Sequence, residues 1–296
     1  MNRVPKFESL SSKTWKVESL RRELVTLLSP LYGDGEAQAM VRLLFHALKG
    51  WNQTDLMIHA DDEPSLYLIS KIEECIKRLL DNEPIQYVLG EARFYGMNLY
   101  VDRNVLIPRL ETEELVDIVV RENSGSDLRV LDVGTGSGAI AIALSRNLRF
   151  PEITVIDISE GALRVARCNA RNLNAPIHFI HEDVFKYEPD AGAFDIIVSN
   201  PPYIAESEMK AMDANVLDYE PHNALFVPED NPLVYYSRIA EIGMKSLVAG
   251  GKLYFEINPL FAGQLKALLE SNGYEDVRIL EDISHKKRFA AAVKRQ

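Results

Sequence analysis

The second half of the chain alternates short apolar runs, typical of buried strands, with stretches of helical periodicity. Because strands that alternate with helices need crossover connections, this pattern predicts a mostly parallel sheet with helices on both faces. The seven strand-like runs are expected at 129–133, 153–156, 177–180, 195–198 and 252–257, and near 276–280 and 289–293. The expected fold class is therefore α/β.

The first 80 residues follow a different pattern, in which apolar side chains recur at helical spacing. Leu20 and Leu24 belong to one such stripe, and Met40 and Leu44 belong to another. Turn and capping residues interrupt the stripes at Ser29-Pro30, Gly33-Asp34-Gly35, Gly50–Asn52 and Asp61–Pro64. A small all-helical N-terminal domain, with roles in packing and in substrate docking, is therefore predicted for residues 1–82.

Short alternating segments then predict a β-hairpin linker over residues 83–108. The paired segments are 93–95 and 98–101. The acidic run Glu111–Glu114 follows and stands in the first turn of a helical stretch, where the helix dipole favours it. This helix opens the third region, residues 109–296, which holds the predicted sheet.

The charge of the chain is distributed unevenly. The first 80 residues carry 11 basic and 11 acidic side chains, whereas the remainder carries 22 and 33, so the whole net charge of −11 lies beyond residue 80. The isoelectric point is near 5.1, and the one basic cluster is Lys286–Arg288. Stable nucleic-acid binding is therefore not expected, and a protein or small-molecule substrate is favoured.

The cysteine content favours a reducing compartment. Cys75 and Cys168 are too few for a disulfide framework, and neither they nor the six histidines have the spacing of a metal site. No apolar run approaches the roughly 18 residues of a membrane span. We therefore expect a cytoplasmic, monomeric protein without a metal or a membrane association.

A glycine-rich turn follows the first expected strand and leads into a helical stretch. It consists of Gly134, Thr135, Gly136, Ser137 and Gly138. Glycines at a strand-to-helix turn let a ligand approach the backbone closely. The same residues also satisfy the relaxed dinucleotide pattern, so the turn alone does not identify the ligand, and a simple tight turn is the alternative.

Acidic residues follow the next two strands. Asp157, about 20 residues beyond the turn, ends the second strand and is placed to accept hydrogen bonds from both ribose hydroxyls. Asp183 follows the third strand, where it can bind an adenine amino group while Val184 or Phe185 packs on the ring. Singly, each acid is better explained as a solvated residue or a cap; together with the glycine turn they predict a nucleoside pocket.

Asn200, Pro201, Pro202 and Tyr203 come directly after the apolar run that ends at Ser199. The two prolines have no backbone N–H to donate, so the loop offers carbonyl oxygens and one side-chain amide as acceptors. A flat group that bears N–H donors, such as an amide or an exocyclic amine, fits such a loop. Tyr203 either forms an aromatic wall or packs under the loop.

With these residues, the chain resembles S-adenosylmethionine-dependent methyltransferases of the seven-stranded Rossmann-like class. It is similar in particular to the HemK/PrmC-type protein-glutamine methyltransferases that modify peptide chain release factors. The resemblance covers nearly the whole chain and rests on Pro84–Tyr87, Arg93–Gly96, Val105–Arg109, Glu111–Glu113, the glycine-rich turn, Asn200–Ile204 and Tyr219–Leu225. The chain departs from the usual pattern at Leu110, Glu256–Pro259 and Ile283–Arg288.

The resemblance implies methyl transfer from S-adenosylmethionine to the side-chain amide nitrogen of a glutamine in the Gly-Gly-Gln loop of a release factor, a step linked to translation termination. In this reading the catalytic loop 200–203 binds the glutamine, and Asn200 also borders the cofactor. Phe94 lines the substrate entrance or packs in the linker. Arg109 is counted among the substrate-binding residues, and it is expected to hold the linker to the catalytic domain by pairing with a carboxylate.

Other functions use part of the same motif set. An adenine-amine methyltransferase shares the Asn-Pro-Pro-Tyr loop, but its nucleic-acid substrate fits the acidic charge poorly. A glutamine methyltransferase that acts on a ribosomal protein remains open, and a nicotinamide oxidoreductase or a non-catalytic nucleoside-binding module would leave the loop unexplained. Residues 206–231 are expected to form a lid, a docking loop or a solvated loop.

Overall fold

The computed structural model describes residues 9–295, and the chain divides into two compact units. The first comprises the residues up to Gly90 together with Ala214–Tyr219, and the second comprises Glu91–Asp213 and the residues from Glu220 onward. The predicted hairpin thus belongs to the second unit. Each unit has its own hydrophobic core.

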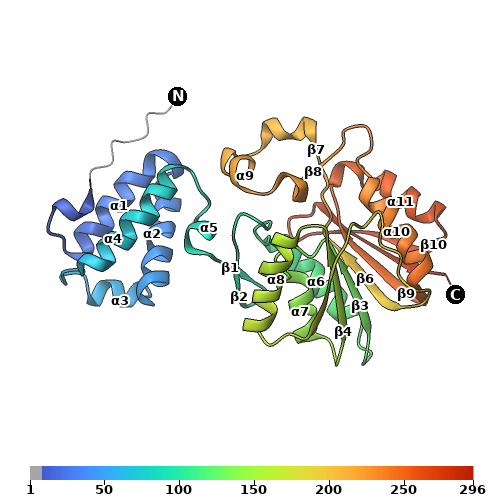
Figure 1. The fold of residues 1–296 in the computed structure, drawn as a ribbon. Helices are drawn as coiled ribbons and strands as arrows, with labels where there is room; N and C mark the ends of the chain where they lie inside the picture. The colour runs from blue at the N-terminus through green and yellow to red at the C-terminus, as the bar shows by residue number, and fades with distance from the viewer. Residues whose placement is uncertain (1–8, 296) are drawn as a thin grey trace. The chain divides into compact units, whose positions relative to one another are not determined.

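The first unit is helical, as predicted. Its elements are η1 (Leu10–Ser12), α1 (Val17–Tyr32), α2 (Asp34–Lys49), α3 (Gln53–Ile58), α4 (Leu66–Leu80), α5 (Ile85–Leu89) and α9 (Ala214–Tyr219). Helices α1, α2 and α4 lie side by side (Figure 1). Their apolar stripes meet in the core of the unit, where Leu20, Leu24, Leu44 and Ile72 are inaccessible to solvent. In the described part of the chain, no helix is both long enough and apolar enough to cross a bilayer.

The predicted helix break at Ser29-Pro30 is wrong, because α1 continues through Pro30 to Tyr32. Pro30 removes one intrahelical hydrogen bond and crowds the carbonyl of the residue four positions before it, and the burial of Leu20, Leu24 and Leu28 on the same helix offsets this cost. The helix ends instead at Gly33, whose φ of 78° few other residues adopt. Its N–H donates to the Ser29 carbonyl at 2.8 Å.

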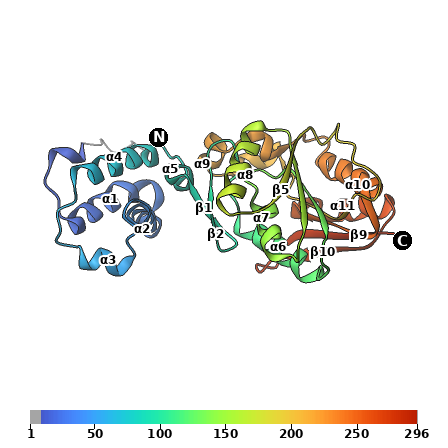
Figure 2. The ribbon, with the colours of Figure 1, turned by 60° about the horizontal axis from the view of Figure 1, so that its bottom comes forward.

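The second unit begins with an antiparallel hairpin, β1 (Glu91–Phe94) and β2 (Met97–Tyr100), which is labelled in Figure 2. A seven-stranded sheet follows in the order β10-β11-β9-β6-β3-β4-β5. Its strands are β3 (Arg129–Val133), β4 (Glu152–Asp157), β5 (Ile177–His181), β6 (Phe194–Ser199), β9 (Leu247–Glu256), β10 (Tyr274–Glu281) and β11 (Lys287–Lys294). All seven predicted strands are present, and β11 alone runs in the direction opposite to the other six.

Helices cover both faces of the sheet, with α6 to α8 on one face and α10 and α11 on the other (Figure 1). Their bounds are α6 (Leu110–Glu122), α7 (Ala139–Asn147), α8 (Glu160–Asn172), α10 (Val234–Ser246) and α11 (Ala262–Ser271). Successive strand residues enter different cores: Val130 packs in the cluster under α6 and α7, and Leu131 packs in the cluster under α10. Burial on both faces explains the continuous apolar runs of the sequence.

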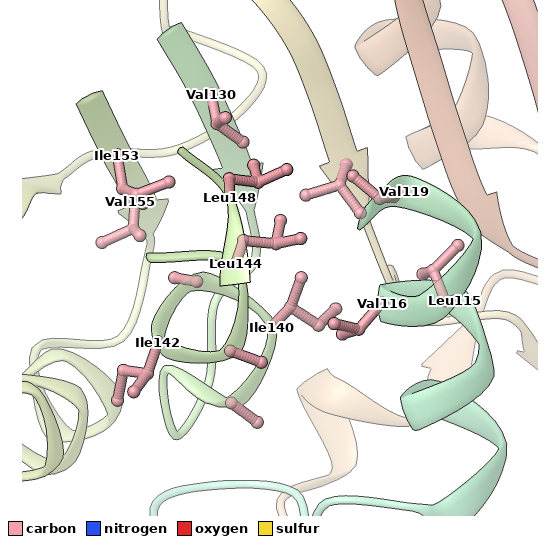
Figure 3. Close-up of a cluster of buried hydrophobic side chains, with 14 of the residues drawn as sticks. Leu115, Val116, Val119, Val130, Ile140, Ile142, Leu144, Leu148, Ile153 and Val155 are labelled. Atoms are coloured by element: carbon pink, nitrogen blue, oxygen red, sulfur yellow. The ribbon is translucent and has the colours of Figure 1, made fainter. Parts of the chain in front are cut away.

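Figure 3 shows the core that anchors α7 to the sheet. Ile140 and Leu144 of α7 lie among Val116 of α6 and the strand residues Val130 and Val155, and all five are buried. Each buried side chain of this kind contributes roughly 1.5–3 kcal/mol. The start of α7, and with it the glycine-rich turn, is therefore held rigidly against the sheet.

The strand order reverses its direction at β3, which creates a topological switch point. From β3 the chain moves outward to β4 and β5, and then returns to the other side of β3 with β6. Open α/β sheets bind ligands at the carboxyl ends of the strands beside such a reversal. Ser199 at the end of β6 pairs with Val133 at the end of β3, so the two following loops start level with each other.

Residues 206–231 form a series of short elements rather than a solvated loop. The segment contains η2 (Glu206–Ala211), α9, η3 (His222–Ala224) and β8 (Phe226–Val227). The strand β8 pairs in parallel with β7 (Ile204–Ala205), directly after the Asn-Pro-Pro-Tyr loop. The segment also contains the buried carboxylate of Glu220.

Candidate active site

A cavity of about 270 Å³ lies in the second unit, at the carboxyl ends of β3, β4, β5 and β6. Most of the predicted site residues line it, namely Arg109, Gly134, Thr135, Gly136, Ser137, Asp157, Asp183, Val184, Asn200, Pro201 and Pro202. Gly138, Tyr203 and Phe94 do not line it. Four strand ends that are distant in sequence thus contribute to one site.

The glycine-rich turn has positive φ at Gly134, Gly136 and Gly138. At Gly136 only the backbone conformation, with a φ of 55°, disfavours another residue type, because a Cβ atom there would meet no neighbour within 4 Å. At Gly138 a Cβ atom would lie only 3.2 Å from the Cβ of Ala166 in α8. Gly138 therefore allows two helices to pack, whereas the first part of the turn exposes its backbone to the cavity.

Asp157 is fixed between the glycine-rich turn and the start of α8. Its Oδ2 accepts the N–H of Gly136 at 2.9 Å, and its Oδ1 accepts the N–H of Ser159 at 2.8 Å. Burial raises the pKa of this carboxyl, and the backbone N–H groups oppose the rise. Each oxygen keeps a lone pair, so the carboxylate can also accept hydrogen bonds from a ribose diol.

The end of the cavity beside β5 combines an acid with aromatic rings. Asp183 Oδ1 accepts the N–H of Phe185 at 3.0 Å. The Phe185 ring lies 5.5 Å from that of Tyr235 in α10, and both rings line the cavity. Sequence reasoning missed Tyr235, because a tyrosine at the start of a helix 50 residues away carries no signal of its own.

Asp132 is a buried acid that the sequence analysis also missed. It is 1% exposed, its Oδ2 accepts the Thr135 hydroxyl at 2.6 Å, and its Oδ1 has no hydrogen-bond partner. Burial raises its pKa to about 7; the Thr135 hydroxyl opposes the rise and Asp157 adds to it. An acidic residue inside an apolar strand, two positions before the glycine turn, was the available signal.

The side-chain amide of Asn200 has one satisfied end and one unsatisfied end. Its Nδ2 donates to the Thr112 hydroxyl oxygen at 3.3 Å, whereas its buried Oδ1 has no partner. A buried acceptor without a partner costs roughly 1–3 kcal/mol, which a ligand donor can recover. Pro201 and Pro202 add carbonyl oxygens without adding N–H donors, as expected.

Tyr203 points away from the cavity. Its hydroxyl donates to Glu256 Oε1 at 2.9 Å, its carbonyl accepts Asn258 Nδ2 at 3.1 Å, and its ring packs against the core under α10. Burial, with Glu256 adding to it, raises the pKa of this hydroxyl. Tyr203 thus holds the end of the loop in place.

Glu256 ends the central strand β9 and was not predicted as a site residue. It is 1% exposed, and its Oε2 accepts the Thr112 hydroxyl at 2.6 Å. Burial raises its pKa, and the hydrogen bonds from Thr112 and Tyr203 oppose the rise, as does the charge of Arg288. The signal in the sequence was a lone acid at the end of an apolar strand.

Arg109 pairs with a carboxylate, Glu220, at 2.6 Å. The second oxygen of Glu220 accepts the N–H of Ile107 at 3.1 Å, and Glu220 is 3% exposed. Phe94 is 1% exposed in the core beneath α6 and α7. Within residues 9–295, no group of three or more His, Cys, Asp or Glu side chains could hold a metal ion.

Comparisons with known proteins agree with this geometry. The family model of the methyltransferase small domain matches residues 111–219, and that of the PrmC N-terminal domain matches residues 20–90. A release factor glutamine methyltransferase from Bacteroides thetaiotaomicron is 46% identical over 90% of this chain and 95% of its own length. One from Flavobacterium psychrophilum is 37% identical over 90% and 95%.

A solved methyltransferase from Pyrococcus furiosus has the same fold. Its TM-score is 0.51 at 17% sequence identity, and the match covers 74% of this chain and 98% of that one. The likeness shows that a protein of very different sequence shares this fold.

Proposed function

The chain belongs to the family of release factor glutamine methyltransferases, and we propose that Asn200 and the Pro201 carbonyl hold the reacting amide. The enzyme transfers a methyl group from S-adenosylmethionine to the side-chain amide nitrogen of a glutamine in a peptide chain release factor. The observation that carries the residue assignment is the buried, unpartnered Oδ1 of Asn200 in the cavity wall.

The cavity fits the nucleoside part of S-adenosylmethionine. In this proposal Asp157 accepts the ribose hydroxyls, Asp183 accepts the adenine amino group, and Val184 packs on the ring. The backbone of the glycine-rich turn borders the amino-acid part of the cofactor. Asp132 does not line the cavity itself, but it is linked to Thr135, which does, so its carboxyl lies behind the part of the turn that borders the ammonium group, whose positive charge would favour the ionised form.

The chemical difficulty lies in the glutamine amide, whose nitrogen lone pair is delocalised into its carbonyl. When bound, S-adenosylmethionine supplies an electrophilic methyl group. Asn200 Oδ1 and the Pro201 carbonyl accept the two amide hydrogens, which holds the nitrogen, favours its pyramidal form and directs its lone pair at the methyl. Positioning of this kind contributes several kcal/mol, up to roughly 7–11 in ideal cases. The amide nitrogen gains a positive charge as the N–C bond forms and the bond from the methyl to sulfur breaks. Its proton then becomes acidic enough to pass to water, so no strong general base is needed.

The glutamine lies in the Gly-Gly-Gln loop of the factor, as the resemblance implies, where small neighbours suit a narrow site. We assign protein docking to the N-terminal unit and positioning of residues 107–109 to the ion pair of Arg109 with Glu220. The enzyme acts as a cytoplasmic monomer and forms no stable complex with nucleic acid in this proposal. Its acidic second unit supports the last point.

The test uses labelled S-adenosylmethionine with three acceptors: an intact release factor, the same factor with the loop glutamine replaced, and bulk nucleic acid. Label is expected on the intact factor alone. Asn200→Ala should reduce kcat by roughly 10²–10³-fold, the usual effect of removing one preorganised polar group, and should leave cofactor affinity nearly unchanged. Label on nucleic acid would instead support an adenine-amine methyltransferase, and near-normal turnover by Asn200→Ala would remove that residue from the mechanism.

A further inference from the structure

Three side chains from three separate elements form a hydrogen-bonded chain behind the reacting site. Thr112 of α6 donates its hydroxyl proton to Glu256 Oε2 of β9 at 2.6 Å. Asn200, after β6, donates Nδ2–H to the Thr112 oxygen at 3.3 Å. Thr112 is 4% exposed and Glu256 is almost fully buried, so water does not compete for these bonds.

The carboxylate of Glu256 fixes the direction in which these hydrogen bonds are donated. An ionised carboxylate only accepts hydrogen bonds, and each hydroxyl has one proton to donate. Thr112 and Tyr203 both use that proton on Glu256, so the Thr112 oxygen has only lone pairs left. The oxygen and nitrogen ends of an asparagine amide have nearly the same shape, and only the nitrogen end can satisfy Thr112.

We propose that Thr112 and Glu256 are positioning residues that hold the Asn200 amide with its oxygen turned to the substrate. This inference rests on the function proposed above, in which the substrate amide brings two N–H donors. A flipped Asn200 would present its own N–H groups to those donors. The unpartnered Oδ1 of Asn200 is the acceptor that the network leaves available.

The same hydrogen bonds should make the rate of methylation depend on pH. Burial raises the pKa of Glu256, Glu111 adds to the rise, and Arg288 opposes it. Tyr203 donates to the carboxylate from the loop, and Tyr236 of α10 donates to the Glu256 backbone carbonyl. A protonated Glu256 can donate to Thr112, whose own proton then turns toward Asn200, and the amide flips. Activity should therefore fall as the pH drops through the pKa of Glu256.

The experiment compares Thr112→Val, which keeps the shape and removes the hydroxyl, with Thr112→Ser, which keeps the hydroxyl. For methylation of the release factor, Thr112→Val should lower kcat by about 100-fold, the cost of a misplaced reacting group, with little change in KM or in cofactor affinity. Thr112→Ser should restore most of the rate. Glu256→Gln, which cannot ionise, should lower the rate and abolish the acid limb of the pH profile.

The wild-type protein and Asn200→Ala are measured in the same series. If both behave as proposed and Thr112→Val turns over like wild type, or Glu256→Gln keeps the acid limb, the positioning role is overturned and the function stands. Absence of glutamine methylation by the wild type overturns both. If Thr112→Val does not fold, the pH profile of Glu256→Gln and the rate of Thr112→Ser decide the question.

Discussion

The carboxyl group of Asp132 is buried beside the glycine-rich turn, so the free energy of unfolding should depend on pH. Its pKa in the folded protein is about 7, against an ordinary value of 3.8. Between these values the folded state binds more protons than the unfolded state, so the free energy of unfolding falls as the pH rises. Asn cannot titrate, so Asp132→Asn does not share this loss of stability. The free energy of unfolding of the variant minus that of the wild type should therefore increase by roughly 3–4 kcal/mol from about pH 4 to about pH 8.

Urea unfolding of both proteins across this range, without cofactor, measures the difference. The titrations of groups that Asp132 does not influence cancel, so the slope reports Asp132 together with its coupling to Asp157. A difference that stays constant with pH would show that the carboxyl is ionised at an ordinary pKa. Thr135→Val is a useful companion, because it removes the hydroxyl that partly stabilises the charged form.

At this scale the sequence located residues that line the cavity and missed the buried acids beside them. Asn200, Asp157 and Asp183 could be predicted because each follows an apolar strand at the edge where ligands bind. Glu256 and Asp132 carried only a weak signal, an acid within an apolar strand, and the partners of Glu256 lie on other elements, Thr112 in α6 and Tyr203 after β6. The hydrogen bond from Thr112 to Glu256 joins residues 144 positions apart, and no local pattern encodes it.

Between elements, the ion pair of Arg109 with Glu220 holds the segment before α6 to the segment after α9. Glu220 is buried and satisfies both the guanidinium group and the N–H of Ile107. Glu220→Ala should therefore lower the free energy of unfolding by about 3–5 kcal/mol, because it leaves a charge and an amide without a partner. Glu220→Gln keeps an acceptor and should cost less.

Thermal or urea unfolding of the two variants gives the comparison. Equal, small losses in both would mean that solvent reaches Arg109 and screens its charge. A loss of methylation without a loss of stability in Glu220→Gln would instead point to a direct role of the pair in substrate binding.

The element pattern was predicted most fully where periodicity is strong. All seven sheet strands and the helices α1 to α4 of the N-terminal unit follow from apolar spacing, since that spacing is the requirement for burial. The other two helices of that unit were not predicted: α5 lies in the region expected to be a hairpin linker, and α9 lies in the aperiodic segment 206–231. The break expected at Pro30 was wrong, because the burial of the apolar side of α1 outweighs the local cost of the proline. Residues 206–231 lack periodicity because their elements are only two to six residues long, so the buried Glu220 was hidden among exposed acids.

For the molecule as a whole, we expect methyl transfer to depend on the second unit and docking of the release factor to depend on the first. Every described residue that lines the cavity belongs to the second unit, and the core of the first unit shares no residue with the cores of the second. A unit with its own core is expected to fold by itself. Two acceptors therefore distinguish the roles of the units: an intact release factor, and a short peptide with the target glutamine.

A chain that begins at Glu91 should bind S-adenosylmethionine as the full chain does, because the glycine-rich turn, Asp157 and Asp183 are all retained. Its kcat/KM for the intact factor should fall by at least about tenfold, which corresponds to roughly 1.4 kcal/mol of lost docking energy. Its kcat/KM for the peptide should stay within about twofold of the value for the full chain. Circular dichroism and cofactor titration verify that the shortened chain is folded. An equal loss on both acceptors would mean that the first unit supports the catalytic site itself, and no loss on the factor would remove docking from its role.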